Sequence, residues 1–563
     1  MRRLRQTVPL LALAFAAACD PPGPAPRLAE GVTREGLTSR LERFVPVEID
    51  APTREVEPWE RAVLARLVRA SEAMHELFLR QMAGGLPALR DALAASDSAW
   101  APAAAAYFDR MAGPWDRLAG DAPFLDVGPR PAGGGFYPED LTSSDLDAWL
   151  REHPEDREAF TDPFSVVRRE HATLIAVPYS AEYRETVGRV ADLLRDAASS
   201  SHSPSLRRYL EARASAVAGA GRSAGAADGA SVEGTRIEAA LGPYGRAEDR
   251  LWGAKAAFTG VVALVDSAAT HRFDETWADP PAVAPAPIAA GRDGPARRPA
   301  GPVRVVDLVH AGGAARAGVH TVALAVAAGA HAGEGARTLV FRNVARAKFE
   351  HVLVPLAGVV LGPPEASALR FDPWFTVLLL REASRAVEPP PGLPGVAAST
   401  PAAGLGRDRA MLEEARAAAM GLAALEAAAV DGRYPEASVR SAYAAHLADL
   451  FRAARFGPAD PRAEAAALQF GWAWERQAIQ FNEEYGAFTF DRAAFAQANR
   501  ELAAEILRVQ AESDDVGAAA LRDRYGEPRP ELADFLPRLA SLPVDIRPQY
   551  VAAARVLDEA RGR

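Results

Sequence analysis

Thiols are almost absent from this 563-residue sequence, which contains a single cysteine, Cys19. No disulfide can form within such a chain, and no catalytic thiol remains beyond that residue. Two other signatures are missing: the G-x-x-x-x-G-K-[ST] loop that cradles nucleotide phosphates and the G-x-S-x-G elbow that presents a catalytic serine. The sequence therefore supports neither a P-loop nucleotide-binding protein nor a serine hydrolase of the α/β type.

Lysine is nearly absent as well, since Lys255 and Lys348 are the only two among 64 basic residues. The abundance of arginine and alanine indicates a lineage or codon bias rather than a function. The net charge of −10 argues against a nucleic-acid partner, because phosphates require a basic surface. With 49% apolar and 25% charged residues, the chain reads as a globular protein of two or three domains or one large bilobal unit.

The first residues resemble a bacterial lipoprotein signal. Three arginines among the first five residues precede a short apolar run at 8–18, which is too brief to span a membrane stably, and Cys19 follows. In such signals the thiol receives a fatty acid such as palmitate, and cleavage makes the cysteine the new N-terminus. The resemblance implies a lipid-anchored protein of the bacterial cell envelope, with the membrane as its partner. Asp20 leaves the choice between inner and outer membrane open, and an ordinary secretory signal with an incidental cysteine is the alternative.

Hydrophobic periodicity and Pro/Gly-rich stretches divide the chain. Apolar residues at three- and four-residue steps predict helices over 54–111, and short Val- and Leu-rich runs predict a sheet in the middle of the chain. The expected fold class is therefore mainly α with a smaller β part. The expected divisions are a signal peptide at 1–19, a tether at 20–45, a helical region with a β-containing lobe at 46–342 that includes a flexible insertion at 279–302, a helical lobe at 343–545 and a C-terminal segment at 546–563.

The individual elements follow from the same patterns. Helices are expected at 183–218, 252–268, 344–361, 410–429, 437–454, 463–485, 492–513 and 516–525. Strands are expected at 174–180, 303–309, 321–327 and 338–341, and loops at 113–118, 133–138, 242–249 and 388–406. His75 and Glu76 look like the start of a zinc motif, but Leu79 stands where its second histidine would be, so we expect an ordinary helix surface there.

Residues 371–389 carry the most informative pattern, an apolar block that turns abruptly charged. Arg381 and Arg385 are four residues apart, so both guanidiniums project from one helix face with Glu382 beside them. Zinc hydrolases carry H-E-x-x-H at this spacing. Arginine keeps its proton and has no lone pair to offer a cation, so this R-E-x-x-R segment cannot bind zinc in the usual way.

Nine segments spread over most of the chain resemble, in their sequence and their order, the dipeptidyl-peptidase III family of zinc peptidases in its shorter bacterial and Nudix-linked form. The resemblance implies a two-lobed fold, with a helical lobe that carries the metal, a lobe with a small β-barrel, and a wide cleft between them. The segments are GPWDRL at 113–118, GGFYPEDL at 134–141, AVPYS at 176–180, GPY at 242–244, NVARAKFE at 343–350, FDPWFTVLLLREASRAVEP at 371–389, EEARAAAMGL at 413–422, FRAARFG at 451–457 and VDIRPQY at 544–550.

The resemblance also implies a role for each site position. The zinc helix of the family falls on 381–385, so Arg381 and Arg385 replace both histidine ligands, whereas Glu382 keeps the position of the catalytic base. The family's second motif, E-E-x-[KR]-A-[DE], places its third ligand on Glu414 and the preceding acid on Glu413.

Other positions depart from the family pattern. Ala418 stands where the second motif of the family has its last acid, and Glu464 stands where family members have a further histidine. The Asn-Leu-Pro-Asn sequence that relatives carry on their substrate-binding strand is absent at the corresponding positions, about 325–328. Gly245 replaces the acid that usually follows GPY. The differences from the family pattern therefore lie at the expected active site, whereas the motifs around it are retained.

A catalytic zinc needs three neutral or anionic ligands, and only Glu414 remains at a matching position. We therefore expect no metal cofactor, and a non-catalytic homologue in which Arg381 and Arg385 replace the charge of the lost ion among Glu382, Glu413 and Glu414. This hypothesis predicts Arg381 or Arg385 within salt-bridge distance of Glu414.

Two alternatives remain open. The cleft between the lobes could hold a peptide or another ligand without cutting it, since arginines in a cleft could hold a carboxylate. The chain could also be an active metallo-hydrolase whose altered site still uses zinc. Outside this site, Arg452 and Arg455 are expected to pair with acids rather than bind phosphate.

Overall fold

The structure is a computed structural model that describes residues 25–219, 232, 235–277, 302–326, 337–385, 405, 408–457 and 460–562. The expected signal peptide with Cys19 lies outside these residues. The same holds for the insertion expected at 279–302, Pro302 excepted, and for the loop expected at 388–406, Leu405 excepted.

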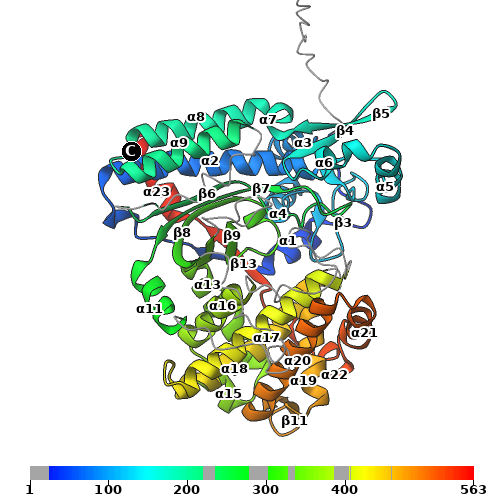
Figure 1. Ribbon diagram of the computed structural model, residues 1–563, viewed down its shortest axis with the longest axis vertical. Helices are drawn as coiled ribbons and strands as arrows, with labels where there is room; N and C mark the ends of the chain where they lie inside the picture. The colour runs from blue at the N-terminus through cyan, green and yellow to red at the C-terminus, as the bar shows by residue number, and fades with distance from the viewer. Residues whose placement is uncertain are drawn as a thin grey trace, which may run out of the picture.

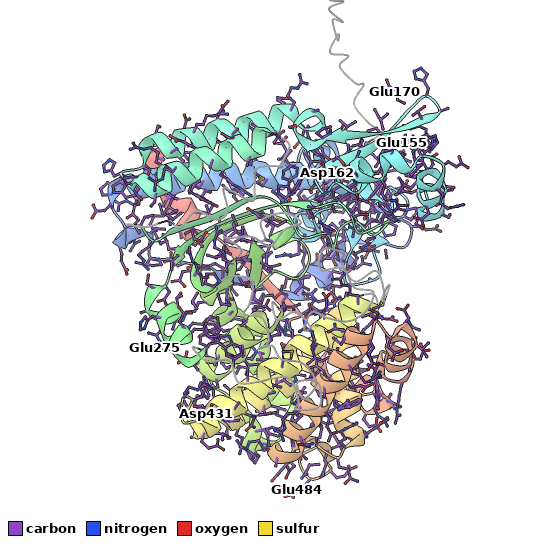
Figure 2. The ribbon with its side chains drawn as sticks, in the orientation of Figure 1. Glu155, Asp162, Glu170, Glu275, Asp431 and Glu484 are labelled. Atoms are coloured by element: carbon purple, nitrogen blue, oxygen red, sulfur yellow. The ribbon has the colours of Figure 1, made fainter. Side chains whose placement is uncertain are left out.

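The chain is mainly helical with small sheets, as the sequence predicts, and it has two parts (Figure 1). The upper part in Figure 1 contains a five-stranded sheet covered by long helices, and the lower part is a bundle of helices. Glu170 and Glu484 mark the two ends of the molecule, each at the tip of a β-hairpin (Figure 2). None of the helices within the described residues is long and apolar enough to cross a bilayer.

The helix α2 (Pro58–Met82) is the support of the upper part. It begins with a proline and a capping box, in which the Glu60 carboxylate accepts a hydrogen bond from the backbone N–H of Glu57 at 2.9 Å. Its apolar residues are buried on two sides, because one side packs on the sheet and the other on α8 (Arg184–Ser200), which pairs with α9 (Pro204–Ala218).

The sheet has the strand order β6-β7-β8-β10-β9, antiparallel except for the parallel pair β8 and β10. Glycines let α2 lie directly on it, because a Cβ added to Gly312 would come within 2.1 Å of the Ser71 carbonyl oxygen. The sheet is the β part expected from the sequence, although its edge strands β6 and β9 are not hydrogen-bonded to each other. The strands are β6 (Ile237–Tyr244), β7 (Ala257–Val265), β8 (Val303–Gly313), β9 (Ala323–Val326) and β10 (Arg337–Phe341).

The lower part is a helical lobe built from alanine- and leucine-rich helices. Small side chains bring the helices close together, most clearly where α17 crosses α16 at Gly421. The helices are α13 (Arg342–Lys348), a π-helical turn (Phe349–Leu353), α14 (Val354–Val360), α15 (Pro363–Ala368), α16 (Phe371–Arg385), α17 (Arg409–Val430), α18 (Glu436–Ala454), α19 (Pro461–Glu475), α20 (Arg492–Glu512) and α21 (Asp515–Tyr525).

The two ends of the described chain meet, because β1 (Phe44–Glu48) pairs in parallel with β13 (Asp545–Gln549). The last helix, α23 (Val551–Ala560), then returns to pack on α2. The remaining elements are α1 (Arg34–Glu42), α3 (Leu86–Ala94), α4 (Ala101–Met111), β2 (Trp115–Asp116), β3 (Ala122–Pro123), α5 (Ser143–Glu152), α6 (Arg157–Thr161), β4 (Ser165–Glu170), β5 (Thr173–Pro178), α7 (Tyr179–Glu182), α11 (Ser267–Trp277), β11 (Ile479–Asn482), β12 (Ala487–Phe490) and α22 (Pro530–Ala533).

Four local predictions differ from the structure. The helix expected at 252–268 is replaced by β7, a run that is buried on both faces and so shows no alternation. The helix expected at 463–485 ends at Glu475, and the hairpin of β11 and β12 follows. The loop expected at 242–249 begins inside β6, and residues 34–45 of the expected tether form α1 and the start of β1.

His75 is a further correction. It was expected on a helix surface, but its side chain is buried at 5% exposure, and its Nδ1 accepts a hydrogen bond from the backbone N–H of Gly313 at 3.3 Å. The helix that carries it is covered on both sides, so no wide surface is left on α2. His75 is therefore a core residue between α2 and the sheet.

Candidate functional site

The R-E-x-x-R segment lies at the C-terminal end of α16. The preceding turns of this helix are buried over most of their surface, with Trp374, Phe375 and Leu380 at 8%, 6% and 0% exposure. That burial fixes the helix in the core. Arg381 and Arg385 then reach the lobe's surface, where α16 faces α17.

Arg385 binds two carboxylates. Its Nη2 lies 2.5 Å from Glu414 Oε2 on α17, and its Nε lies 3.0 Å from Glu382 Oε2 on its own helix. Arg381 donates from Nε to the other oxygen of Glu382 at 3.1 Å. The predicted salt bridge between this helix and Glu414 is therefore confirmed, and it is made by Arg385.

The charges of this cluster stabilise one another. Burial by itself raises the pKa of Glu414, but the guanidiniums of Arg385 and Arg381 outweigh it and hold that pKa below its ordinary value. Burial likewise disfavours the charged form of Arg385, but Glu382 and Glu414 reverse this effect and raise the pKa of Arg385. Both shifts favour the charged forms, so Glu414 and Arg385 stay ionised at neutral pH and hold each other in place.

Glu413 and Glu464 do not belong to this cluster. Glu413 accepts a hydrogen bond from Arg409 Nε at 2.8 Å, and both side chains are about 40% exposed on the outer side of α17. Successive residues on a helix point about 100° apart, so Glu413 and Glu414 cannot both face α16. The expectation of a three-acid cluster is wrong at Glu413. Glu464 is half-buried on α19 and does not line the pocket described next.

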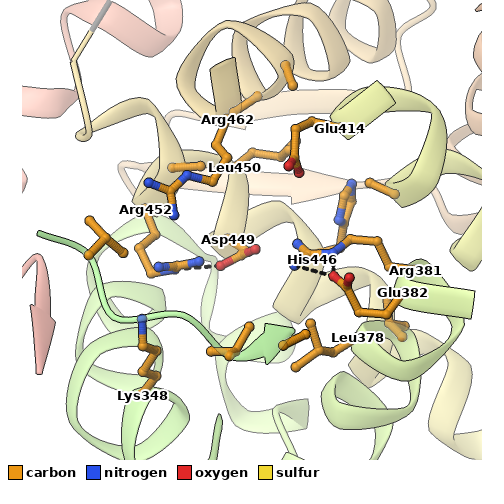
Figure 3. Close-up of a pocket in the computed structure, with 18 of the residues that line it drawn as sticks. Lys348, Leu378, Arg381, Glu382, Glu414, His446, Asp449, Leu450, Arg452 and Arg462 are labelled. Carbon is orange, nitrogen blue, oxygen red and sulfur yellow. Dashed lines mark hydrogen bonds and ion pairs between the residues drawn. The ribbon is translucent and has the colours of Figure 1, made fainter. Parts of the chain in front are cut away.

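A pocket of about 340 Å³ opens beside the cluster, between the helical lobe and the segment 319–323, which leads into the first residue of β9 (Figure 3). It lies between the two parts of the molecule, where the resemblance implies a cleft. The charged side chains that line it are Lys348, Arg381, Arg385, Arg452, Arg462, Glu382, Glu414 and Asp449.

Three of these cations were missed as site residues. Arg452 donates to Asp449 at 2.6 Å, which confirms its expected pairing with an acid. Arg462 pairs with Asp460 at 2.6 Å, and Lys348 with Asp545 at 2.7 Å. The sequence carried one signal for them, since Lys348 and Arg452 lie in segments quoted for the resemblance; no local pattern shows that they converge.

Two further residues, Arg455 and His446, come from α18 and its C-terminal end. Arg455 was expected to pair with an acid, but it donates to the carbonyl oxygens of Leu542 and Pro543 at 2.5 and 2.8 Å. His446 lines the pocket, and burial above all lowers its pKa to about 4, so it is neutral at pH 7.

The residues present do not fit the zinc ion that the resemblance implies. Arg381 and Arg385 occupy both histidine positions and cannot donate a lone pair to a metal. Glu414, the remaining ligand position, is already bound by Arg385. Across the part of the chain that the structure describes, no group of three or more His, Cys, Asp or Glu side chains is placed to hold a metal ion.

Known proteins that are similar to this chain were found both by sequence and by structure. Nudix hydrolase 3 of Arabidopsis thaliana is 27% identical over 584 residues, which cover 93% of this chain and 75% of that protein. The structure of DPP III from Caldithrix abyssi superposes with a TM-score of 0.81 at 29% identity and covers 92% of this chain and 100% of that one. The dipeptidyl-peptidase III of Corallococcus sp. strain EGB superposes with a TM-score of 0.85 at 29% identity, over 95% of this chain and 99% of that one. No family model matches the chain.

Proposed function

The chain is a dipeptidyl-peptidase III-like protein, and from this premise we propose that it is a lipid-anchored, non-catalytic relative that has lost zinc. Its neighbours of known structure are named as peptidases, whereas this chain carries an Arg/Glu cluster at the positions that resemble the zinc helix of the family. The proposed role is to bind a ligand in the pocket between the lobes without cutting it.

The contact of Arg385 with both Glu382 and Glu414 carries this proposal. Two buried acids near each other repel unless a cation lies between them. A guanidinium supplies that positive charge and several N–H donors in fixed directions, so the two acids can lie close together without a metal. Because the cation is covalently part of the helix, the cluster has no position at which a water could be activated by a metal.

The N-terminal sequence supports the anchoring part of the proposal. A charged start, an apolar run at 8–18 and a cysteine directly after it resemble the signal of bacterial lipoproteins. Acylation of Cys19 would hold the protein at the bacterial envelope. The test is Cys19→Ser: labelled palmitate should enter the wild-type chain and not the variant, and the variant should leave the membrane fraction. Equal labelling of both would contradict the anchor.

Metal content and peptidase activity test the loss of zinc. The full chain, purified in detergent, should contain no stoichiometric zinc and should release no dipeptides from peptide substrates, with or without added zinc. Activity that a chelator abolishes would instead establish an active metallo-hydrolase with an altered site.

A reversion variant separates the arginines from other causes. Arg381→His with Arg385→His restores H-E-x-x-H beside Glu414, and this double variant should bind zinc tightly. The matched control is Arg409→His with Glu413→His, which places two histidines four residues apart on the exposed side of α17 without the third ligand. If the reversion variant binds zinc no better than this control, the two arginines are not what displaced the metal.

A further inference from the structure

We propose that the pocket beside Arg385 binds a small organic oxyanion, with its carboxylate or phosphate group held by Arg452, Arg462 and Lys348. This inference rests on the proposed function, because it needs a pocket without zinc. Figure 3 shows these three cations along one side of the pocket and Arg381 with Glu382 along the opposite side.

The two arginines among these cations keep unused donors. Arg452 donates only from Nε, to Asp449, so its two terminal nitrogens make no hydrogen bond within the described residues. Arg462 uses Nε and Nη2 on Asp460, and its Nη1 has no hydrogen-bond partner in the part of the chain that the structure describes. Each carboxylate thus fixes its cation from one side and leaves N–H groups for another partner.

The acids of the pocket do not use these donors. Glu382 accepts from Arg381 and Arg385 with its two oxygens, and Glu414 accepts from Arg385. Asp449 is taken by Arg452. Five cationic and three acidic side chains therefore line the pocket, and the other two balancing acids, Asp460 and Asp545, lie outside its lining.

The cations are held in place before any ligand arrives. The guanidiniums of Arg452 and Arg462 lie 5.1 and 4.7 Å from the centre of the same Phe456 ring. Lys348 is fixed by Asp545 at 2.7 Å and by the carbonyl oxygen of His320 at 2.5 Å. Groups that are already ordered lose little conformational entropy on binding, so such a site favours a charged ligand.

The three like charges also act on one another. Burial is the main cause that lowers the pKa of Lys348 to about 8; Asp545 opposes it, and Arg452 and Arg462 add to it. An oxyanion bound between them would offset this repulsion and strengthen each donor.

The size and the apolar lining of the pocket restrict the kind of ligand that it can hold. A volume of about 340 Å³ is in the range of small-molecule sites rather than of long peptides. Leu378, Leu450 and Trp374 line it alongside the charged groups. The chemistry therefore suits a compact ligand with an apolar middle and an oxyanion at its end.

Binding of inorganic phosphate, of glutarate and of neutral glutaramide to the full chain tests this inference by calorimetry at low ionic strength. At least one anion should bind and glutaramide should not. A preference for glutarate identifies a carboxylate ligand, and a preference for phosphate identifies a phosphate ester.

Two matched variants locate the site. Arg462→Gln removes an ion pair, a ring contact and a pocket donor, and should lower the affinity for the anion about tenfold. Arg476→Gln removes an ion pair with Glu501 and a ring contact with Trp472 at the end of the same helix but no pocket donor, so its affinity should equal that of wild type.

Each outcome decides the inference. No binding by any anion, binding of glutaramide as tight as that of glutarate, or equal losses in the two variants would overturn it. Zinc content is measured on the same sample. Anion binding that disappears with a chelator would overturn both proposals, whereas a zinc-free protein that binds no anion would overturn this one alone.

Discussion

Arg385 Nη2 lies 2.5 Å from Glu414 Oε2, and this contact joins α16 to α17 at the place where the resemblance implies a metal ion. A metal would couple the two helices through its ligands. Here one guanidinium does so, because its Nε also binds Glu382. The same pair of helices is thus linked by a bond that does not depend on metal supply.

Removing this link should cost stability. Arg385→Met keeps the apolar stem but leaves Glu382 and Glu414 facing each other, and we expect a loss of about 2 kcal/mol in the free energy of unfolding, less than for a fully buried pair. The control is Arg409→Met, whose partner Glu413 is exposed, with an expected loss of about 0.5 kcal/mol. Chemical denaturation measures both. Equal losses in the two variants would mean that Arg385 contributes no more than a surface charge.

The cluster should also give stability a defined dependence on pH. The pKa of Glu414 in the folded protein lies below its ordinary value of 4.5, so its ionised form favours folding. This contribution is complete above pH 4.5 and is lost as the pH falls through the folded-state pKa. The difference in unfolding free energy between wild type and Glu414→Gln should therefore be constant near neutral pH and shrink in acid. In an Arg385→Met background the same difference should be smaller and depend less on pH; an unchanged profile would refute the assignment.

Glycine at the crossing of α16 and α17 is expected to be essential for their spacing. A Cβ on Gly421 would lie 2.9 Å from the backbone nitrogen and 3.1 Å from the Cα of Arg381, and a backbone cannot move aside cheaply. Gly421→Ala should therefore destabilise the protein by about 1–3 kcal/mol. Gly358→Ala in α14 meets nothing within 4 Å and should stabilise it by about 0.5–1 kcal/mol. Thermal unfolding distinguishes the two; a gain in both would show that the helices are not in tight contact.

The sequence predicted part of the site because spacing along one helix is a local property. Arg381, Glu382 and Arg385 could be placed on one face from their numbers alone. Glu414 entered through the resemblance. Glu413 was misplaced because a pair of adjacent acids does not reveal which one faces the neighbouring helix.

The remaining charged residues of the pocket could not be predicted from local sequence patterns. Lys348, Arg452 and Arg462 come from three separate helices, and only the packing of those helices brings them to one wall. Arg452 had an adequate interpretation by itself, as the partner of an acid, and no local pattern marked Lys348 or Arg462 as a site residue. Their convergence depends on tertiary contacts that no single stretch of sequence encodes.

The same distinction applies to the fold. Long amphipathic helices such as α2 and α18 were predicted because their apolar period extends over several turns. β7 was taken for a helix because a strand buried on both faces is a continuous apolar run, which periodicity cannot tell from a buried helix. α1 was taken for tether because Leu37 is its one buried residue and no period is visible.

The two lysines give the last prediction, since both are buried in the folded protein. Lys255 is 0% exposed, and its Nζ donates to the carbonyl oxygens of Phe160 and Asp162 at 2.7 and 2.9 Å; Lys348 is 4% exposed. A bulky, charged amine reagent should therefore modify neither side chain in the native protein and both after denaturation, as read by peptide mass spectrometry. Arg195→Lys, at a position where the side chain is 53% exposed, is the internal control and should be labelled at once. Rapid native labelling of Lys255, at a rate close to that of this control, would contradict its burial between α6 and β4, whereas protection of both native lysines beside a labelled control would establish it.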